Sequence, residues 1–399
     1  MPAKPAKHYL QTSAQTQLAQ AIGAKDNDSR GVVPAIHVAT TYLRGEDNSY
    51  PNGRIYSRAD NPNYELVEQL LCTLEQGQDA LLFSSGMAAA VSVFQALKPG
   101  DRVLIPTVMY WALRNWLLGF GQDAGLLVVS VDMTDVGAVE QALKAAPTQL
   151  VWLETPGNPM WNVTDIAAIA ALIEQHSPST LLAVDSTCAT PLLTQPLNLG
   201  ADVVMHSATK YLNGHSDVIA GALVYRAKPR TDSYWQRVRK VRAQGGAVPS
   251  PHDASQLLRG MRTMALRVRE SCESAMFLAE QLSSWPEIAE VLYPGLPSHP
   301  QHAVAKRQMQ GGFGGMLSVR FNGTASKTGE QVAIGVAAHT QLWQRATSLG
   351  GVESLIEHRA SVEGQGTPCP DDLLRLSTGI ETAADLLADL RQALQQARA

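Results

Sequence analysis

Lys210 ends the segment Ala201-Asp-Val-Val-Met-His-Ser-Ala-Thr-Lys, in which a short apolar run leads into small hydroxyl residues. Lysine normally lies at the surface, so a lysine directly after a hydrophobic strand either pairs with another group or takes part in covalent chemistry. Its amine could form a Schiff base with a carbonyl cofactor such as pyridoxal phosphate, and the hydroxyls of Ser207 and Thr209 could hold the phosphate. Taken alone, the segment fits a lysine that caps a strand end better, so the interpretation depends on the rest of the chain.

Asp185 ends a second apolar run, Leu181-Leu-Ala-Val-Asp. The pattern predicts a buried parallel strand that delivers a carboxylate at its carboxyl end, where open α/β sheets bind ligands. Such a carboxylate would keep a pyridine nitrogen protonated, which makes the cofactor ring an electron sink. An acid that caps the following helix is the alternative for the same pattern.

Gly86 lies at the bend of Leu82-Phe-Ser-Ser-Gly-Met-Ala-Ala-Ala, which predicts a strand followed directly by a helix. The exposed N–H groups and the dipole at a helix N-terminus favour a phosphate. One such turn is weak evidence. Together, the three segments supply the parts that pyridoxal phosphate chemistry requires.

Further segments follow one another in a characteristic order: Tyr56-Ser-Arg58 with Asn61-Pro62, Phe83-Ser-Ser-Gly-Met87, Glu154-Thr-Pro-Gly-Asn158-Pro159, Val184-Asp-Ser-Thr187, Ser207-Ala-Thr-Lys-Tyr211, Ser348-Leu-Gly-Gly-Val-Glu-Ser354 and Leu374-Arg-Leu-Ser377. In order and spacing they resemble the Cys/Met-metabolism family of pyridoxal phosphate enzymes, which includes cystathionine lyases and synthases and methionine γ-lyase. The resemblance covers nearly the whole chain.

The resemblance implies cofactor roles for individual residues. Lys210 would carry the cofactor as a Schiff base and act as the proton shuttle, and Asp185 would pair with the pyridinium nitrogen. Asn158 would contact the phenolic oxygen. The implied phosphate-binding residues are Gly86, Met87, Ser207 and Thr209, joined from a neighbouring subunit by Tyr56 and Arg58. The catalytic unit would therefore be a dimer.

The same resemblance implies substrate roles. Tyr110 matches the family's ring-stacking tyrosine and is a candidate acid or base for the leaving group, although an ordinary half-buried aromatic is the alternative. Arg375 would bind the α-carboxylate through a bidentate fork, the alternative being a surface arginine on a strand. The expected substrate-binding residues are Arg375, Ser348, Asn158, Thr347 and Trp111, and no metal is expected.

Several departures from the family pattern concern the substrate. Thr347 stands where the cystathionine-handling γ-enzymes used for comparison carry an acid, which puts recognition of a distal ammonium in doubt. Trp111 and Ala112 replace two glycines after Tyr110, so an indole would narrow or roof the pocket. Arg359 and Glu363 would add charge near the substrate mouth, or form a solvated surface pair. Ser186 and Cys188 replace an asparagine and an aromatic residue and would alter packing beside the ring.

The pattern predicts an α/β fold of the fold-type I transferase class, with a mostly parallel seven-stranded sheet covered by helices on both faces. We expect an N-terminal arm at residues 1–62 that contacts a neighbouring subunit, a cofactor-binding domain at 63–255 and a smaller α+β domain at 256–399. Expected strands are Arg102–Pro106, Leu126–Val131, Leu150–Glu154, Leu181–Asp185, Val203–Met205, Val218–Tyr225 and Met316–Phe321. A helical stretch is expected from Pro251 to Trp285, and Leu386, Leu390 and Leu394 place an apolar stripe on the last helix.

Composition indicates a cytoplasmic enzyme. The chain has 399 residues, of which 45% are hydrophobic and 17% charged, enough for two cores. The formal net charge of -4 argues against a nucleic-acid partner. Cys72, Cys188, Cys272 and Cys369 lie too far apart for a zinc or disulfide framework. The first eight residues lack the apolar core of a secretory signal, and the longest apolar region, Ala80 to Leu97, is interrupted by polar residues, so no membrane span is expected.

The predicted function is a homo-oligomeric pyridoxal phosphate lyase that removes a sulfur- or oxygen-linked group from an amino-acid side chain. The expected assembly is a homotetramer with a dimer as the catalytic unit. A γ-elimination is favoured, on a substrate of the methionine, canavanine or cystathionine type, with Glu363 as a guess for the partner of a cationic tail. A γ-replacement synthase and a cystathionine β-lyase are alternatives within the fold. A catalytically inactive binding protein is the alternative of another class, against which Lys210, Asp185, Tyr110 and Arg375 argue together.

Overall fold

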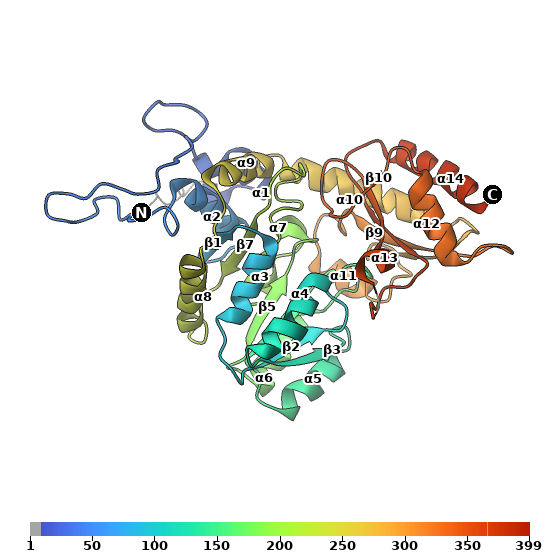
Figure 1. Ribbon diagram of the computed structural model, residues 1–399, viewed down its shortest axis with the longest axis horizontal. Helices are drawn as coiled ribbons and strands as arrows, with labels where there is room; N and C mark the ends of the chain where they lie inside the picture. The colour runs from blue at the N-terminus through green and yellow to red at the C-terminus, as the bar shows by residue number, and fades with distance from the viewer. Residues whose placement is uncertain (1–8, 365) are drawn as a thin grey trace.

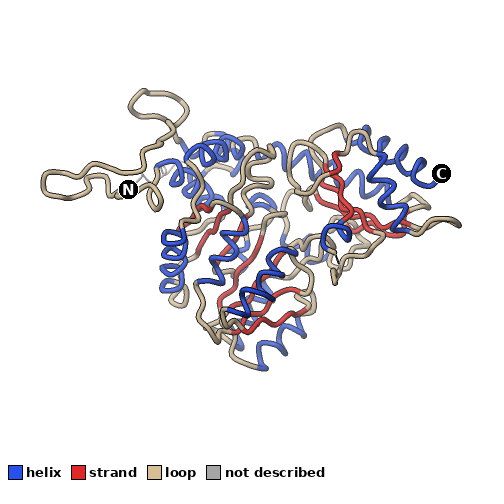
Figure 2. The backbone as a smooth tube through the Cα atoms, viewed as in Figure 1, coloured by secondary structure: helices blue, strands red, loops and turns tan. Residues whose placement is uncertain are grey.

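The computed structural model describes residues 9–364 and 366–399 of the chain. Its first elements are η1 (Tyr9–Gln11), α1 (Ala14–Ala19) and η2 (Ala21–Gly23), and they pack on the body of the protein, with Leu18, Ala21 and Ile22 buried in its core. Residues 24–61 contain only an isolated bridge between Thr41 and Tyr56, and this segment leaves the body of the protein as two long loops (Figures 1 and 2). Residues 1–8 of the expected arm lie outside the described residues.

A seven-stranded sheet forms the centre of the larger part of the molecule. Its strands lie in the order β1-β7-β6-β5-β4-β2-β3, with β7 antiparallel to both neighbours and the other pairs parallel. They are β1 (Asp79–Phe83), β2 (Arg102–Pro106), β3 (Leu127–Val131), β4 (Leu150–Glu154), β5 (Leu181–Asp185), β6 (Val203–His206) and β7 (Gly221–Tyr225). The expected mixed, mostly parallel sheet is confirmed, and each expected strand lies within a few residues of its predicted bounds.

The inner strands are mainly apolar because both faces of the sheet are buried there, whereas most of the edge strand β3 is exposed or half-buried. In β4, Leu150 and Trp152 belong to one hydrophobic cluster, and Val151 and Leu153 belong to the other. The first cluster includes α3 (Gly86–Gln95), α4 (Trp111–Trp116), the π-helical turn η3 (Leu117–Gly121) and α8 (Asp232–Gly245). The second includes α2 (Pro62–Leu74), α5 (Val136–Ala145) and α6 (Ile166–His176), so helices cover both faces.

Side-chain caps begin the helices that follow the strands of the large sheet. Ser85, Asp135 and Asp165 each accept a hydrogen bond from a backbone N–H of the first turn of α3, α5 and α6. α3 begins three residues after the end of β1 and α5 five residues after the end of β3, whereas the longer loop of residues 155–165 separates β4 from α6. The remaining short elements of this part are α7 (Thr190–Leu193) and η4 (Pro196–Leu199).

The helical stretch expected from Pro251 to Trp285 is confirmed, and the structure divides it into two helices, α9 (Pro251–Met261) and α10 (Met264–Leu282). The last turn of α9 makes a tight backbone contact, since a Cβ atom on Gly260 would lie 2.3 Å from the carbonyl oxygen of Asn213. Nη2 of Arg267 donates to the Gly260 carbonyl at 2.8 Å, which satisfies that group where the helix ends. α9 also spans residue 255, which is the predicted boundary between the cofactor-binding domain and the smaller domain. The three-part division of the chain remains a prediction.

A second, five-stranded sheet has the order β10-β11-β12-β9-β8. Its strands are β8 (Ile288–Leu292), β9 (Met316–Phe321), β10 (Gln344–Arg345), β11 (Leu355–His358) and β12 (Leu373–Ser377), and its helices are α11 (His302–Gln308), α12 (Gly329–His339), α13 (Arg359–Glu363) and α14 (Ala383–Arg398). The predicted stripe on α14 is confirmed, since Leu386, Leu390 and Leu394 are buried in the core of this sheet. No helix in the described part of the chain is long and apolar enough to cross a membrane.

Candidate active site

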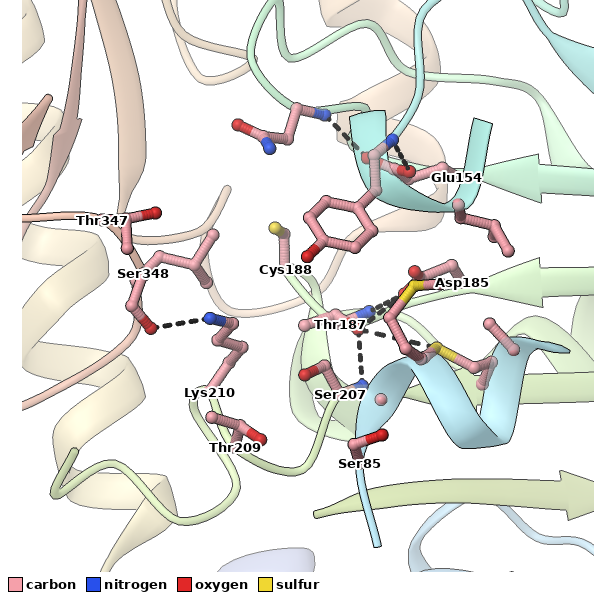
Figure 3. Close-up of a pocket in the computed structure, with 18 of the residues that line it drawn as sticks. Ser85, Glu154, Asp185, Thr187, Cys188, Ser207, Thr209, Lys210, Thr347 and Ser348 are labelled. Carbon is pink, nitrogen blue, oxygen red and sulfur yellow. Dashed lines mark hydrogen bonds between the residues drawn. The ribbon is translucent and has the colours of Figure 1, made fainter. Parts of the chain in front are cut away.

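A cavity of about 270 Å³ lies at the carboxyl edge of the large sheet, where the second sheet approaches it. Its lining comes from the start of α3, the ends of β4, β5 and β6, and the loop before β11 (Figure 3). The residues predicted from the sequence that line it are Gly86, Met87, Tyr110, Asn158, Asp185, Ser207, Thr209, Lys210, Thr347, Ser348 and Arg375.

Lys210 lies in the turn after β6, where its N–H donates to the carbonyl of Ser207 at 3.1 Å. Its side chain points into the cavity, and Nζ donates to Oγ of Ser348 at 2.6 Å (Figure 3). Burial lowers the pKa of the Lys210 amine to about 8, with a further contribution from the nearby positive charge of Arg375. Roughly a tenth of the amine is therefore neutral near pH 7, far more than for an ordinary lysine, and a nucleophile or proton acceptor must be neutral.

Asp185 ends β5, and its carboxylate is held by the next turn. The N–H and the hydroxyl of Thr187 donate to Oδ1 of Asp185 at 3.0 and 2.6 Å. The same hydroxyl accepts the N–H of Ser207 at 2.8 Å, so Thr187 links the carboxylate to the turn that carries Lys210. Burial raises the pKa of Asp185, and the bonds from Thr187 oppose that rise. Asp185 forms no ion pair within residues 9–364 and 366–399, so a cationic ring nitrogen would supply the missing counter-charge.

The start of α3 forms one wall of the cavity. A Cβ atom on Gly86 would lie 2.7 Å from Oγ of Ser207, so only glycine lets the helix start approach the lysine turn this closely. The first N–H groups of α3 have no carbonyl partner within the helix. Thr209 also faces the cavity, but its hydroxyl exchanges hydrogen bonds with the backbone of Ala220 at 3.0 and 3.1 Å. This wall combines hydroxyls, backbone N–H groups and a helix dipole, which fits a phosphate.

Glu154 is a cavity residue that the motifs did not single out. It ends β4 beside Asp185, and its carboxylate accepts the N–H of Tyr110 at 2.6 Å and that of Asn158 at 3.0 Å. Burial, and to a smaller extent the neighbouring carboxylate of Asp185, raise the pKa of Glu154 well above its usual range, while the two backbone bonds oppose the rise. Glu154 thus fixes the positions of two predicted site residues. The rule that found Asp185, an acid at the end of an apolar strand, would also have found Glu154.

Arg375 lies on β12 and is buried, so the surface-arginine alternative is wrong. Its guanidinium donates to the amide oxygen of Asn158 at 3.2 Å and to the carbonyl of Ser348 at 2.8 Å, and pairs with Glu357 at 2.6 Å. Ser348 has φ of 89°, a backbone conformation that costs energy in a non-glycine residue. Ser348 therefore connects the amine of Lys210, through its hydroxyl, with the guanidinium of Arg375, through its carbonyl.

Three predicted site residues lie outside the cavity lining of a single chain. Tyr56 and Arg58 belong to the arm, where the Arg58 guanidinium lies 5.4 Å from the centre of the Tyr56 ring. Trp111 begins α4, and its ring packs against the guanidinium of Arg114, whose Cζ lies 5.2 Å from the ring centre. The roles of these three residues remain predictions.

Arg359 and Glu363 are not the solvated surface pair that the sequence allowed. Arg359 lines the cavity and is 4% exposed, and Glu363 is 8% exposed. Nη2 of Arg359 donates to Oε1 of Glu363 at 2.7 Å. Glu363 does not line the cavity, and its carboxylate is already bound to Arg359 and to the hydroxyl of Thr367. The guess that Glu363 receives a cationic substrate tail is therefore wrong, and canavanine loses its support from this residue.

The cavity as a whole fits pyridoxal phosphate. One wall suits a phosphate, the carboxylate of Asp185 lacks a cation, and a partly neutral lysine amine lies between the two sheets. A mixed seven-stranded sheet with these groups at its carboxyl edge defines a pyridoxal phosphate enzyme.

Comparison with known proteins gives the same class. A family model described as "Cys/Met metabolism PLP-dependent enzyme" matches residues 15–395. The chain is 41% identical to the cystathionine gamma-synthase of Mycobacterium leprae over 393 residues, which cover 97% of this chain and 98% of that protein. It is 39% identical to the L-methionine gamma-lyase of Pseudomonas deceptionensis over 379 residues, covering 91% and 89%. The crystal structure of cystathionine gamma synthase from Xanthomonas oryzae pv. oryzae in complex with cystathionine has a TM-score of 0.90 at 35% identity, covering 97% of this chain and 98% of that chain.

The chain therefore belongs to the Cys/Met-metabolism family of pyridoxal phosphate-dependent enzymes. Its relatives are named both as synthases and as lyases. The resemblance drawn from the motifs, the cofactor and the enzyme class are thus confirmed, and the class of reaction is a pyridoxal phosphate-dependent lyase or synthase reaction.

Proposed function

We propose that the protein eliminates a γ-substituent from an amino acid whose side chain has no distal positive charge, with methionine-type compounds as the substrate class. One observation carries the proposal. Ser348 bonds to both Lys210 and Arg375, which holds a proton acceptor and a carboxylate-binding group on one side of the cavity. Thr347, next to them, lines the cavity without a charge. A distal ammonium would therefore find no carboxylate at this position.

When bound, pyridoxal phosphate supplies an aldehyde that attaches to an amino group and a cationic ring that accepts the electrons released at Cα. Arg375 binds the α-carboxylate of the amino acid and so fixes the direction of the Cα–H bond. Nζ of Lys210, in its neutral form, takes the proton from Cα, and because a γ-elimination also breaks a Cβ–H bond, the same amine would take the Cβ proton after it has passed on the first one. Asp185, held by Thr187, keeps the positive charge on the ring nitrogen. Tyr110, positioned through Glu154, offers a hydroxyl that can exchange a proton with the leaving group.

A γ-replacement reaction is the second candidate. It is supported by the 41% identity to the cystathionine gamma-synthase of Mycobacterium leprae. Elimination and replacement share the proton removals at Cα and Cβ and the loss of the γ-substituent. In replacement a thiol then adds to Cγ, whereas in elimination the unsaturated product is released and hydrolysed to a keto acid and ammonia. The same residues would serve both, so the two candidates call for one experiment.

The experiment is a keto-acid release screen of purified enzyme over methionine, cystathionine, homocysteine, cysteine, canavanine and acylated homoserines. The proposal expects keto acid from methionine-type compounds and little from cystathionine. Repetition with added cysteine separates the two candidates, because replacement would consume the acylated homoserine with less keto acid released. Lys210→Ala is the inactive control, and Lys98→Ala, at an exposed lysine outside the cavity, is its matched active control. Preferred cleavage of cystathionine would contradict the proposed selectivity.

We also infer a homo-oligomer in which the arm binds a neighbouring subunit, with a dimer as the catalytic unit and a tetramer as the expected assembly. The arm supports this because it exposes several large apolar side chains, including Val32 at 86% and Leu43 at 93%. Tyr56 and Arg58 lie on the same arm and would reach the phosphate of the neighbouring site. The four cysteines are free, which supports the reducing cytoplasm as its location.

A further inference from the structure

A row of four buried charged side chains lies beside the cavity: Arg375, Glu357, Arg359 and Glu363. Each is less than a tenth exposed, and their formal charges sum to zero. Glu357 on β11 and Arg375 on β12 are directly paired across the two strands. This register places the Glu357 carboxylate on the guanidinium that the proposed function assigns to the substrate carboxylate.

Glu357 is shared between two guanidinium groups. Its Oε2 atom lies 2.6 Å from Nη2 of Arg375 and 2.9 Å from Nη1 of Arg359. Arg359 is the first residue of α13 and lines the cavity together with Arg375. One carboxylate oxygen therefore lies between the two arginines at the cavity wall.

Arg359 is itself held by Glu363 one helical turn further along α13. Nε and Nη2 of Arg359 both donate to Oε1 of Glu363, at 3.2 and 2.7 Å, and the hydroxyl of Thr367 donates to Oε2. The guanidinium is thus fixed from one side by Glu363 while its other side faces Glu357. Because Glu363 balances its charge, Arg359 does not present a second uncompensated positive charge to a substrate carboxylate.

A substrate carboxylate and Glu357 compete for Arg375. If Arg375 were the only guanidinium beside Glu357, moving Arg375 towards a substrate would leave a buried carboxylate without an ion-pair partner. Such an unpaired buried charge is strongly unfavourable. Arg359 removes this obstacle, because Glu357 retains one ion pair when Arg375 turns to the substrate.

We propose that Arg359 is a positioning residue that retains Glu357 while Arg375 binds the α-carboxylate, and that the Arg359–Glu363 pair thereby sets the affinity of the site for amino acids. The inference rests on the proposed function, since it assumes that Arg375 binds a substrate carboxylate. It assigns to Arg359 an effect on binding rather than on the proton transfers at Lys210.

The test measures binding of L-alanine, an amino acid without a leaving group, to the holoenzyme through the change in the cofactor's visible absorption. The double variant Arg359→Met, Glu363→Gln removes a neutral pair and keeps the net charge. We expect its Kd for L-alanine to rise about 10-fold or more, with KM for the best substrate rising in parallel and kcat changing less. Addition of Glu357→Gln to this variant removes the competing carboxylate and should restore most of the affinity.

The matched control is Lys144→Met, Glu140→Gln, which removes an exposed ion pair of the same i,i+4 spacing on α5 and should leave the Kd unchanged. Unchanged affinity of the Arg359, Glu363 variant, or failure of Glu357→Gln to restore it, would overturn the inference. If the double variant does not fold, the single variant Glu357→Gln tests the inference. It should bind L-alanine more tightly than the wild-type enzyme, and equal or weaker binding would contradict the inference. A wild-type holoenzyme that shows no spectral response to any amino acid would instead overturn the proposed function itself.

Discussion

Thr187 links the two groups on which the proposed chemistry depends, and its hydroxyl offers a sharp perturbation. Thr187→Val keeps the shape of the side chain but removes the hydrogen bond to Asp185 at 2.6 Å and the acceptor for the N–H of Ser207 at 2.8 Å. A hydrogen bond to a charged group contributes about 1.5–3 kcal/mol, and a tenfold change in an equilibrium constant corresponds to about 1.4 kcal/mol. The backbone N–H of Thr187 still donates to Asp185. We therefore expect the affinity for pyridoxal phosphate to fall about 10-fold near pH 7.

The sign of the pH dependence follows from the carboxyl of Asp185. Burial raises its pKa and the bonds from Thr187 lower it, so loss of the hydroxyl raises the pKa further. A smaller fraction of Asp185 is then ionised at a given pH, and a protonated carboxyl cannot balance a cationic ring. The loss of affinity should therefore be largest at low pH and should shrink as the pH rises.

The assay is titration of the apoenzyme with pyridoxal phosphate, followed by absorbance at several pH values. Thr180→Val is the matched control, because Thr180 is a buried threonine just before β5, at the opposite end of that strand from Asp185, and its hydroxyl donates to the carbonyl of Thr148 at 2.6 Å. That variant should lose stability but retain cofactor affinity. Wild-type affinity in Thr187→Val, or a loss that is equal at every pH, would refute the reasoning.

Further predictions concern the lysine, the arm and selectivity. Lys210→Ala should bind the cofactor non-covalently and lose at least ~10³-fold in turnover. The control Lys98→Ala should keep wild-type turnover, and near-normal turnover of Lys210→Ala would contradict the proposed mechanism. A mixture of inactive Arg58→Ala and inactive Lys210→Ala protomers should regain activity, because one site of a hybrid dimer is intact; no recovery after demonstrated subunit exchange would remove Arg58 from the neighbouring site. Thr347→Glu should raise kcat/KM for cystathionine about 3- to 5-fold and leave methionine little changed, since an ion pair at an exposed position contributes at most about 1 kcal/mol. An unchanged ratio of kcat/KM for cystathionine to kcat/KM for methionine would show that residue 347 does not contact the side chain of the substrate.

The sequence predicted the sheet and the residues at its carboxyl edge well, because both depend on local patterns. Short apolar runs that end in Asp185 or lead into Lys210 indicate buried strands, and parallel strands bring such ends together. Glu154 follows the same rule at the end of β4. Its contacts with the backbone of Tyr110 and Asn158 depend on how the loops after β2 and β4 pack, which no local pattern encodes.

The buried pair of Arg359 and Glu363 was beyond prediction from the sequence. Charged residues at i and i+4 on a short helix usually form an exposed pair. Here their burial depends on Glu357 and Arg375, which meet only through the register of β11 with β12. The tight contact of Gly260, in the last turn of α9, with the backbone of Asn213 likewise joins segments that are distant in the sequence and is encoded by no local pattern.

The central claim is that Lys210 carries the cofactor, and peptide mass spectrometry tests it most directly. The purified holoenzyme is reduced with borohydride, which fixes a Schiff base as a stable amine, and then digested and sequenced. We predict a pyridoxyl phosphate adduct on the peptide that contains Lys210, loss of the visible absorption band on reduction, and no adduct at this position in Lys210→Ala. An adduct on a different lysine of the wild-type enzyme, or a coloured enzyme whose Lys210 remains unmodified after reduction, would contradict the account.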